Sequence, residues 1–283
     1  MKCALVGSDH RVLHTERHPT GRERGPEAVV QTIIEVASGL AARGDAEAIG
    51  IVVPGVIDEA NGVARYSSNV GFRDVPLRDL LQNKLGIAAT LGHDVRAGGL
   101  AEARLGAGKG RAQVLVMPIG TGIAAAHVVN GVVASGAHGA AGEIGHIVVR
   151  PEGPKCGCGQ LGCLEAVASA SAVERRYAEL AGEALTAAQI AGRIGEDPIA
   201  ARVWRETVAA LADGLLTGQA LYDAELIIIG GGLAESGETL LAPLREGLAS
   251  RATFHRVPEI VKAKLGDEAG CLGAALLALE LLP

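Results

Sequence analysis

The stretch Glu143–Glu165 reads E-I-G-H-I-V-V-R-P-E-G-P-K-C-G-C-G-Q-L-G-C-L-E and gathers metal-binding side chains in one loop. Its imidazole and thiols belong to His146, Cys156, Cys158 and Cys163. One imidazole and three thiolates form the closed tetrahedral set that zinc prefers at structural sites, whereas a catalytic zinc keeps a position open for water. The alternative is core or redox cysteines beside a satisfied histidine, and the tight clustering between glycines disfavours it. We therefore expect a structural zinc ion that shapes the loop 146–163.

Two acidic residues flank this loop without being needed by the metal. Glu143 precedes the histidine, and Glu165 follows the last cysteine. A zinc ion that folds the loop also fixes both carboxylates in space. They are therefore candidates for binding a ligand rich in hydroxyl groups. The two remaining cysteines, Cys3 and Cys271, are interpreted as small core residues.

Composition excludes several classes of protein. The 283 residues suit one large domain or two lobes. A formal charge of −6 with no basic run argues against a nucleic-acid partner. No apolar run of about 18 residues is free of charges and turn signals, so no membrane span is expected. The N-terminus M-K-C-A-L-V-G-S-D-H does not resemble a secretory signal. Reduced, metal-binding cysteines then predict a cytoplasmic protein.

Strand and helix patterns alternate along the chain and restart once. The first pass has apolar strand patterns at 2–7, 11–16, 48–53 and 87–91 and helical patterns from Pro26 and at 77–85 and 95–105. After a glycine-rich break at 106–110, strands are expected at 113–119, 123–129, 132–133, 225–229 and 259–262, and helices at 170–181, 186–194, 198–221, 239–251 and 270–282. This alternation predicts an α/β protein with a mainly parallel or mixed sheet. Two passes predict two related lobes, 1–110 and 111–269, and the closing helix 270–283 can pack back on the first.

Two glycine clusters follow buried strand patterns. In Gly120-Thr121-Gly122, backbone N–H groups and the threonine hydroxyl could bind a phosphate. The alternative is an ordinary strand-to-strand turn. In Gly230-Gly231-Gly232, the absence of side chains would suit a base or phosphate lying on the backbone.

Two polar residues stand where a ligand could bind. Asp94 lies at the carboxyl end of a predicted strand, where open α/β sheets place their ligands. Its carboxylate could take a proton from an attacking hydroxyl, or it could cap the following helix. Asn69 offers a donor and an acceptor to a pair of hydroxyls, and the alternative is a plain turn asparagine.

Taken together, these motifs resemble the ROK family, the repressor–open reading frame–kinase group of bacterial sugar kinases and regulators. The resemblance is carried by Glu143-x-Gly145-His146 and then by Cys156-x-Cys158-Gly159-x-x-Gly162-Cys163-x-Glu165. Further support comes from Pro54-Gly55, Asn69, Asp94 with Glu102, Gly120-Thr121-Gly122, Gly230-Gly231-Gly232 and Gly266–Ala275. The resemblance covers essentially the whole chain.

The resemblance implies an actin-like ATPase fold, with two lobes each built on a ribonuclease-H-like sheet and with sugar and ATP meeting in a cleft. It implies an ATP-dependent hexose kinase, with glucose and its 6-hydroxyl as the expected substrate and Asp94 as the general base. The implied sugar contacts are Asn69, Glu143, His146 and Glu165. The implied nucleotide contacts are Gly120, Thr121 and Gly122 for phosphate, and Gly231 and Gly232 for the adenosine. Catalytic Mg²⁺, structural Zn²⁺ and a homodimer are also expected.

The sequence departs from the family pattern in three places. The opening motif Asp-x-Gly-Gly-Thr, which helps to hold ATP and magnesium, is absent, so we expect that the true start and a first strand lie upstream of Met1. The usual Asn-Asp pair is here His93-Asp94, with Arg96 where asparagine is common, which bears on hexose selectivity. Ala124-Ala125-Ala126 occupies positions where glycines are frequent, and its methyl groups could crowd the phosphate site.

Other functions remain open at this point. A sugar-sensing transcriptional repressor would need a DNA-binding helix-turn-helix, and the charge of the chain is wrong for DNA. A sugar-binding protein without catalysis is a third interpretation, which nucleotide binding would distinguish from a kinase. Within the kinase class, N-acetylmannosamine, N-acetylglucosamine and fructose are alternative substrates.

Overall fold

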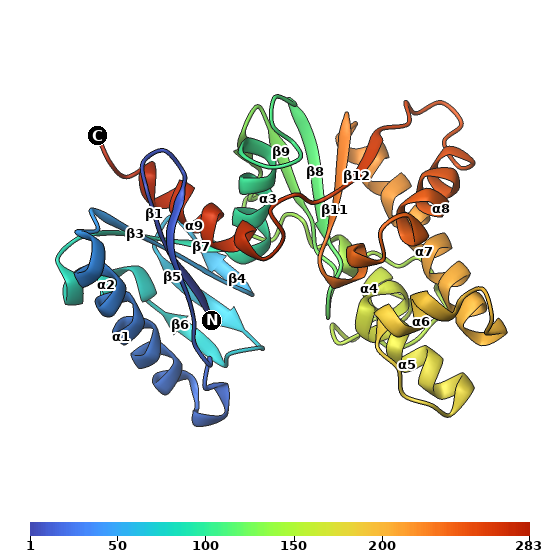
Figure 1. Cartoon of the computed structure of the whole chain (residues 1–283), viewed down its shortest axis with the longest axis horizontal. Helices are drawn as coiled ribbons and strands as arrows, with labels where there is room; N and C mark the ends of the chain where they lie inside the picture. The colour runs from blue at the N-terminus through green and yellow to red at the C-terminus, as the bar shows by residue number, and fades with distance from the viewer. The chain divides into compact units, whose positions relative to one another are not determined.

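The computed structural model describes residues 1–283, and they form two compact units (Figure 1). The first unit comprises Met1–Ala101, Ser135–Ala141 and Asp267–Pro283. The second unit comprises Glu102–Ala134 and Gly142–Gly266. None of the helices is both long and apolar enough to cross a membrane.

The division between the units falls inside a helix, between Ala101 and Glu102, rather than at the glycine-rich break that ends at residue 110. The carboxylate of Glu102 accepts hydrogen bonds from the backbone N–H groups of Ala107 (3.0 Å) and Leu265 (2.6 Å). These bonds tie the end of the helix to the second unit. A glycine-rich pattern marks the loop, but the long-range bonds of Glu102 decide where the unit begins.

The first unit contains three small sheets. Its strands are β1 (Lys2–Val6) with β2 (Val12–Arg17), antiparallel; β3 (Ala48–Val53) with β7 (Ala88–His93), parallel; and β4 (Val56–Asp58), β5 (Val63–Ser67) and β6 (Phe72–Val75), antiparallel. Its helices are α1 (Pro26–Gly44), α2 (Leu77–Leu85), α3 (Asp94–Arg104, which crosses into the second unit) and α9 (Ala269–Leu279), with the short 3₁₀ turns η1 (Arg22–Arg24) and η4 (Gly266–Glu268). The sheet β4–β5–β6 was not predicted from the sequence, because its strands are short and separated by turn residues.

Close backbone approaches seat α9 in the first unit. A methyl group added at Gly50 of β3 would lie 1.8 Å from the carbonyl oxygen of Ala274 in α9. One added at Gly273 of α9 would lie 2.1 Å from the carbonyl oxygen of Ala97 in α3. Only glycine permits packing at these distances. The last helix therefore belongs to the same unit as the first strands, although most of the chain separates them.

The second unit is built on a mixed five-stranded sheet in the order β10–β9–β8–β11–β12. Its strands are β8 (Gln113–Pro118), β9 (Ala126–Val129), β10 (Val132–Val133), β11 (Leu226–Gly230) and β12 (Glu259–Lys262). The neighbours β8, β11 and β12 run parallel, whereas β9 and β10 are antiparallel. Its helices are α4 (Leu164–Ala168), α5 (Ala170–Ala181), α6 (Ala187–Arg193), α7 (Pro198–Tyr222) and α8 (Glu238–Ala249), with the 3₁₀ turns η2 (Ile144–His146) and η3 (Gly232–Ser236). The α/β class with a mixed sheet is as predicted.

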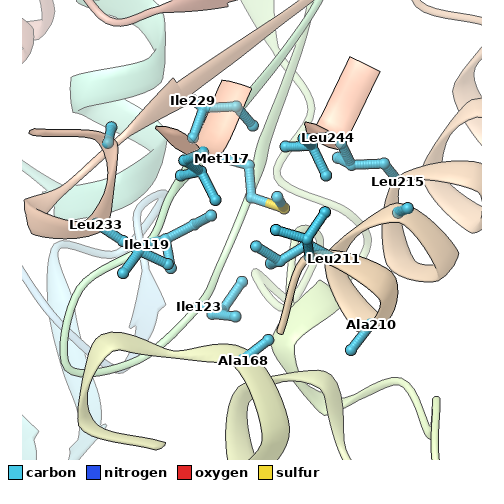
Figure 2. Close-up of a cluster of buried hydrophobic side chains, with 14 of the residues drawn as sticks. Met117, Ile119, Ile123, Ala168, Ala210, Leu211, Leu215, Ile229, Leu233 and Leu244 are labelled. Carbon is cyan, nitrogen blue, oxygen red and sulfur yellow. The ribbon is translucent and has the colours of Figure 1, made fainter. Parts of the chain in front are cut away.

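A buried apolar cluster fixes the carboxyl ends of β8 and β11 in the second unit. Figure 2 shows Met117 and Ile119, at the end of β8, among side chains that include Leu211 of α7 and Ile229 of β11. All four of these residues are fully buried. Leu233 of η3 closes the cluster beside Ile119. This packing holds rigid the two strand ends from which both glycine clusters emerge.

Candidate functional site

The four predicted metal ligands come together in the second unit. The Nδ1 atom of His146 lies 3.6 Å from Sγ of Cys156, and Sγ of Cys158 lies 3.6 Å from Sγ of Cys163. One ligand atom from each of the four residues lies within 4.8 Å of the others. Zinc–sulfur bonds of about 2.3 Å place two ligands of a tetrahedral ion roughly 3.7 Å apart. The cluster can therefore hold one tetrahedral metal ion.

Tight turns build this loop. The N–H of Cys156 donates to the carbonyl oxygen of Gln160 (2.8 Å), and the N–H of Gly159 donates to that of Cys156 (3.0 Å). Gly162 has a φ of +69°, and an added Cβ would lie 1.4 Å from the carbonyl oxygen of Arg150. No other residue fits there. The two turns thus bring Cys156 and Cys158 back toward Cys163.

The thiols differ in their acidity. Burial raises the pKa of the Cys163 thiol to about 12. The backbone N–H of Gln160 lowers the pKa of Cys158, which is exposed. At neutral pH the buried thiol therefore keeps its proton unless a nearby positive charge stabilises the thiolate. A bound divalent cation would supply that charge, because a coordinated thiol is deprotonated outright.

His146 presents its two ring nitrogens to different neighbours. Nδ1 faces the thiol of Cys156, whereas Nε2 lies 3.9 Å from a carboxylate oxygen of Glu143. The first nitrogen can bind a metal while the second stays on the side of an exposed carboxylate. His146 and Glu143 therefore form one polar patch beside the metal cluster.

Glu165 connects the metal loop to the first glycine cluster. It lies in the first turn of α4, two residues after the last cysteine ligand. Its Oε2 accepts a hydrogen bond from the backbone N–H of Ile123 (2.9 Å), and a methyl group added at Gly122 would lie 2.4 Å from this oxygen. The carboxylate thus fixes the shape of the loop 120–123, a contact that the sequence did not reveal.

The loop after β8 exposes backbone to solvent. The N–H of Gly120 bonds to the carbonyl oxygen of Gly122 (2.9 Å), and the carbonyl of Gly120 accepts from the N–H of Ala170 at the start of α5 (2.9 Å). Thr121 is exposed between them. A methyl group added at Gly120 would meet no atom within 4 Å. This loop is open enough for a ligand to approach its backbone.

The second glycine cluster has a packed member and an open one. Gly231 has a φ of +77°, and an added Cβ would lie 2.4 Å from the carbonyl oxygen of Ile119. At Gly232 an added Cβ would meet nothing within 4 Å. Gly231 therefore serves close packing against the end of β8, and Gly232 offers the accessible backbone.

The remaining predicted residues lie in the first unit. Asp94 follows β7 directly and begins α3, and its side chain is 42% exposed. Its Oδ1 accepts a hydrogen bond from the N–H of Val95 (2.8 Å) and lies 3.5 Å from Nδ1 of His93. Asn69 is exposed in the turn between β5 and β6. Asp94 thus bonds the next backbone N–H of its own helix while its carboxylate stays accessible to a ligand.

The structure also locates the departures from the family pattern. Ala125 and Ala126 are buried in the second unit, and Ala124 is half-buried. Arg96 is buried and bonds to Glu59. Sequence reasoning singled out Arg96 but missed Glu59. No local pattern signals this pair, because its members are far apart in the chain.

Comparisons with known proteins show what the chain as a whole resembles. The sequence profile of the ROK family matches residues 1–281. The chain is 37% identical to a glucokinase of Thermotoga maritima, over 98% of this chain and 93% of that protein. Among solved structures, it is similar to a ROK hexokinase from Thermus thermophilus (34% identity, TM-score 0.83, covering 96% and 92% of the two chains).

It is also similar to a ROK family glucokinase from Streptomyces griseus, solved in complex with glucose and AMPPNP (30% identity, TM-score 0.84, covering 98% and 95%). The α/β fold is accordingly the actin-like ATPase fold. With its His-Cys₃ loop and a profile match along nearly its entire length, the chain belongs to the ROK family.

Proposed function

We propose that this protein is an ATP-dependent kinase that phosphorylates glucose at its 6-hydroxyl. The observation that carries the proposal is the likeness, along nearly the whole chain, to a solved glucokinase that binds glucose and AMPPNP. The relative from Thermotoga maritima, also a glucokinase, supports the same substrate. The accessible carboxylate and the open glycine backbones are the chemical groups that such a reaction needs.

Asp94 is the proposed general base. The oxygen of the 6-hydroxyl attacks the γ-phosphorus of ATP, its proton passes to the Asp94 carboxylate, and ADP leaves with the electrons of the broken phosphorus–oxygen bond. The hydrogen bond from Val95 fixes Oδ1, so the carboxylate holds one orientation.

The other polar residues are proposed to bind the substrates. Asn69, Glu143, His146 through Nε2, and Glu165 would bind sugar hydroxyls, because their donors and acceptors match a polyol. Gly120, Thr121 and Gly122 would bind phosphate through the backbone and a hydroxyl, and Gly231 and Gly232 would support the adenosine. Mg²⁺ bound with ATP would offset the charge on the transferred phosphoryl group.

The metal of the His-Cys₃ cluster is proposed to be a structural zinc ion. All four ligands come from the protein, which leaves no position for a reacting water. The ion would hold His146 and Glu165 in place. Thiolate ligands of this kind suit a reducing compartment such as the cytoplasm. A homodimer, expected from the family resemblance, can be tested by sedimentation.

A coupled assay of ADP release tests the proposed function. The wild-type protein is incubated with ATP, Mg²⁺ and each of glucose, N-acetylmannosamine, N-acetylglucosamine and fructose. We expect glucose to have the highest kcat/KM and the reaction to stop when Mg²⁺ is chelated by EDTA. Preference for another sugar would move the assignment within the kinase class. Sugar binding without ADP release from any sugar would favour a non-catalytic sensor.

A further inference from the structure

A buried arginine lies close to the proposed base. Arg96 stands two residues after Asp94 in the first turn of α3, and its side chain is 2% exposed. Its Nε and Nη2 both donate to Oε1 of Glu59 (3.1 and 2.9 Å). Its Nη1 donates to the carbonyl oxygen of Gly139 (2.8 Å). The planar guanidinium therefore bonds two separate partners at once, which a lysine ammonium could not reproduce with the same geometry.

Glu59 also holds the strand that leads to the base. The same oxygen, Oε1, accepts a hydrogen bond from the backbone N–H of His93 (3.2 Å). One carboxylate oxygen thus bonds the residue before Asp94 and the residue two positions after it. The junction of β7 and α3 is clamped on both sides of the proposed base.

The third partner, Gly139, belongs to the segment Ser135–Ala141 of the first unit. This segment is closed by a hydrogen bond from the N–H of Ala141 to the carbonyl of Ser135 (3.1 Å). Gly139 has a φ of +69°, and an added Cβ would lie 2.6 Å from the carbonyl oxygen of Ile57. Arg96 therefore fixes a closely packed segment.

The chain continues from this segment directly into the second unit. The carbonyl of Gly142 accepts a hydrogen bond from the N–H of Ala125 (2.7 Å), and Glu143 follows. The bond from Arg96 holds the backbone at Gly139, which lies four residues before Glu143. The guanidinium is bonded to Glu59, which also holds the residue before the proposed base, and to the chain that leads to one proposed sugar ligand.

A buried guanidinium is costly unless it is fully paired, so its bonds define one arrangement of their partners. Supporting bonds of this kind keep a reacting group within a fraction of an ångström of its working position. We propose that Glu59 and Arg96 are positioning residues for sugar phosphorylation, acting through Asp94 and through the segment 135–141. This inference rests on the proposed kinase function, because it concerns the geometry of that reaction.

Four variants test the inference: Arg96→Met, Arg96→Lys, Glu59→Ala and Glu59→Gln. We expect Arg96→Met and Glu59→Ala to lower kcat by roughly 10- to 100-fold, because small displacements of a base have effects of that size. Since neither residue is among the proposed nucleotide contacts, KM for ATP should stay within about twofold of the wild-type value. Arg96→Lys should not restore the rate.

Glu59→Gln provides rescue by a conservative change. Its side-chain carbonyl oxygen can accept the same bonds from His93 and Arg96, so most of the lost rate should return. Glu59 is also 33% exposed, so its variants should fold even if the Arg96 variants do not. The matched control is Asp58→Asn, which breaks the exposed ion pair with Arg65 (2.7 Å) one position away and should leave kcat unchanged.

The outcomes separate the positioning role of Glu59 and Arg96 from the proposed kinase function. An active wild-type protein whose Glu59→Ala variant keeps kcat within about twofold would overturn the positioning role alone. The same holds if Asp58→Asn lowers kcat as much as Glu59→Ala, or if Glu59→Gln loses as much rate as Glu59→Ala. A wild-type protein that phosphorylates no sugar would overturn the proposed function and this inference together.

Discussion

Adding one methyl group at Gly231 should destabilise the second unit strongly. Gly231 has φ 77° and ψ 177°, a conformation open essentially only to glycine, and forcing another residue into it costs about 1–3 kcal/mol. The new Cβ of Gly231→Ala would also lie 2.4, 2.6 and 2.7 Å from the backbone O, C and N of Ile119. Ile119 is fully buried, and its backbone is bonded to Gly230 and Leu233, so it cannot move aside cheaply.

Together, the backbone strain and the overlap with Ile119 should lower the free energy of unfolding by about 3 kcal/mol or more. A loss of 1 kcal/mol lowers Tm by roughly 2–4 °C in a domain of this size. Thermal unfolding of Gly231→Ala should therefore show a Tm lowered by about 6–12 °C. The neighbouring change Gly232→Ala is the control, because its Cβ meets no atom within 4 Å. It should leave Tm nearly unchanged and raise KM for ATP if the adenosine lies there. A Gly231→Ala protein that unfolds at the wild-type temperature would refute the packing argument.

Two further predictions concern the metal loop and its support. Cys156→Ser should lose bound zinc, measured by elemental analysis, together with kinase activity, whereas Cys271→Ser should keep both; a zinc-free variant with full activity would contradict the structural role. Burial raises the pKa of Asp213, but hydrogen bonds from Arg150 and Arg251 outweigh it and leave the pKa below its ordinary value. A lowered pKa stabilises the folded state above the unfolded value of about 3.9, and this stabilisation is lost as pH falls through the folded pKa. Asp213→Asn should accordingly lower Tm at pH 7, with the difference from the wild type shrinking below about pH 4, and a constant difference across that range would count against the ion pairs.

Strong local signals predicted many of the elements. Pro26 begins α1 at its first turn, and the apolar run Ala48–Val53 is β3 with the expected bounds. The helix Leu77–Leu85 and the strand Glu259–Lys262 also have the expected bounds. Each of these segments begins with a proline or is bounded by a proline or a glycine, so the information is local.

Long-range contacts account for what the sequence did not predict. The sheet β4–β5–β6 consists of strands of three to five residues, too short for a period to stand out. The place of segment 135–141 in the first unit depends on Arg96, whose bond to Gly139 joins distant parts of the chain. The bond between Glu165 and Ile123 is of the same kind. Such contacts follow from the packed fold and leave no mark in local periodicity.

The most direct test of the central claim compares the wild-type protein with Asp94→Asn. Formation of glucose 6-phosphate from glucose and MgATP is measured for both, and glucose binding is measured by calorimetry. We expect turnover by the wild type. Asp94→Asn should lose at least roughly 10²-fold in kcat, because the amide cannot accept the proton, whereas its glucose affinity should be nearly unchanged. An Asp94→Asn protein that still phosphorylates glucose at the wild-type rate would contradict the account.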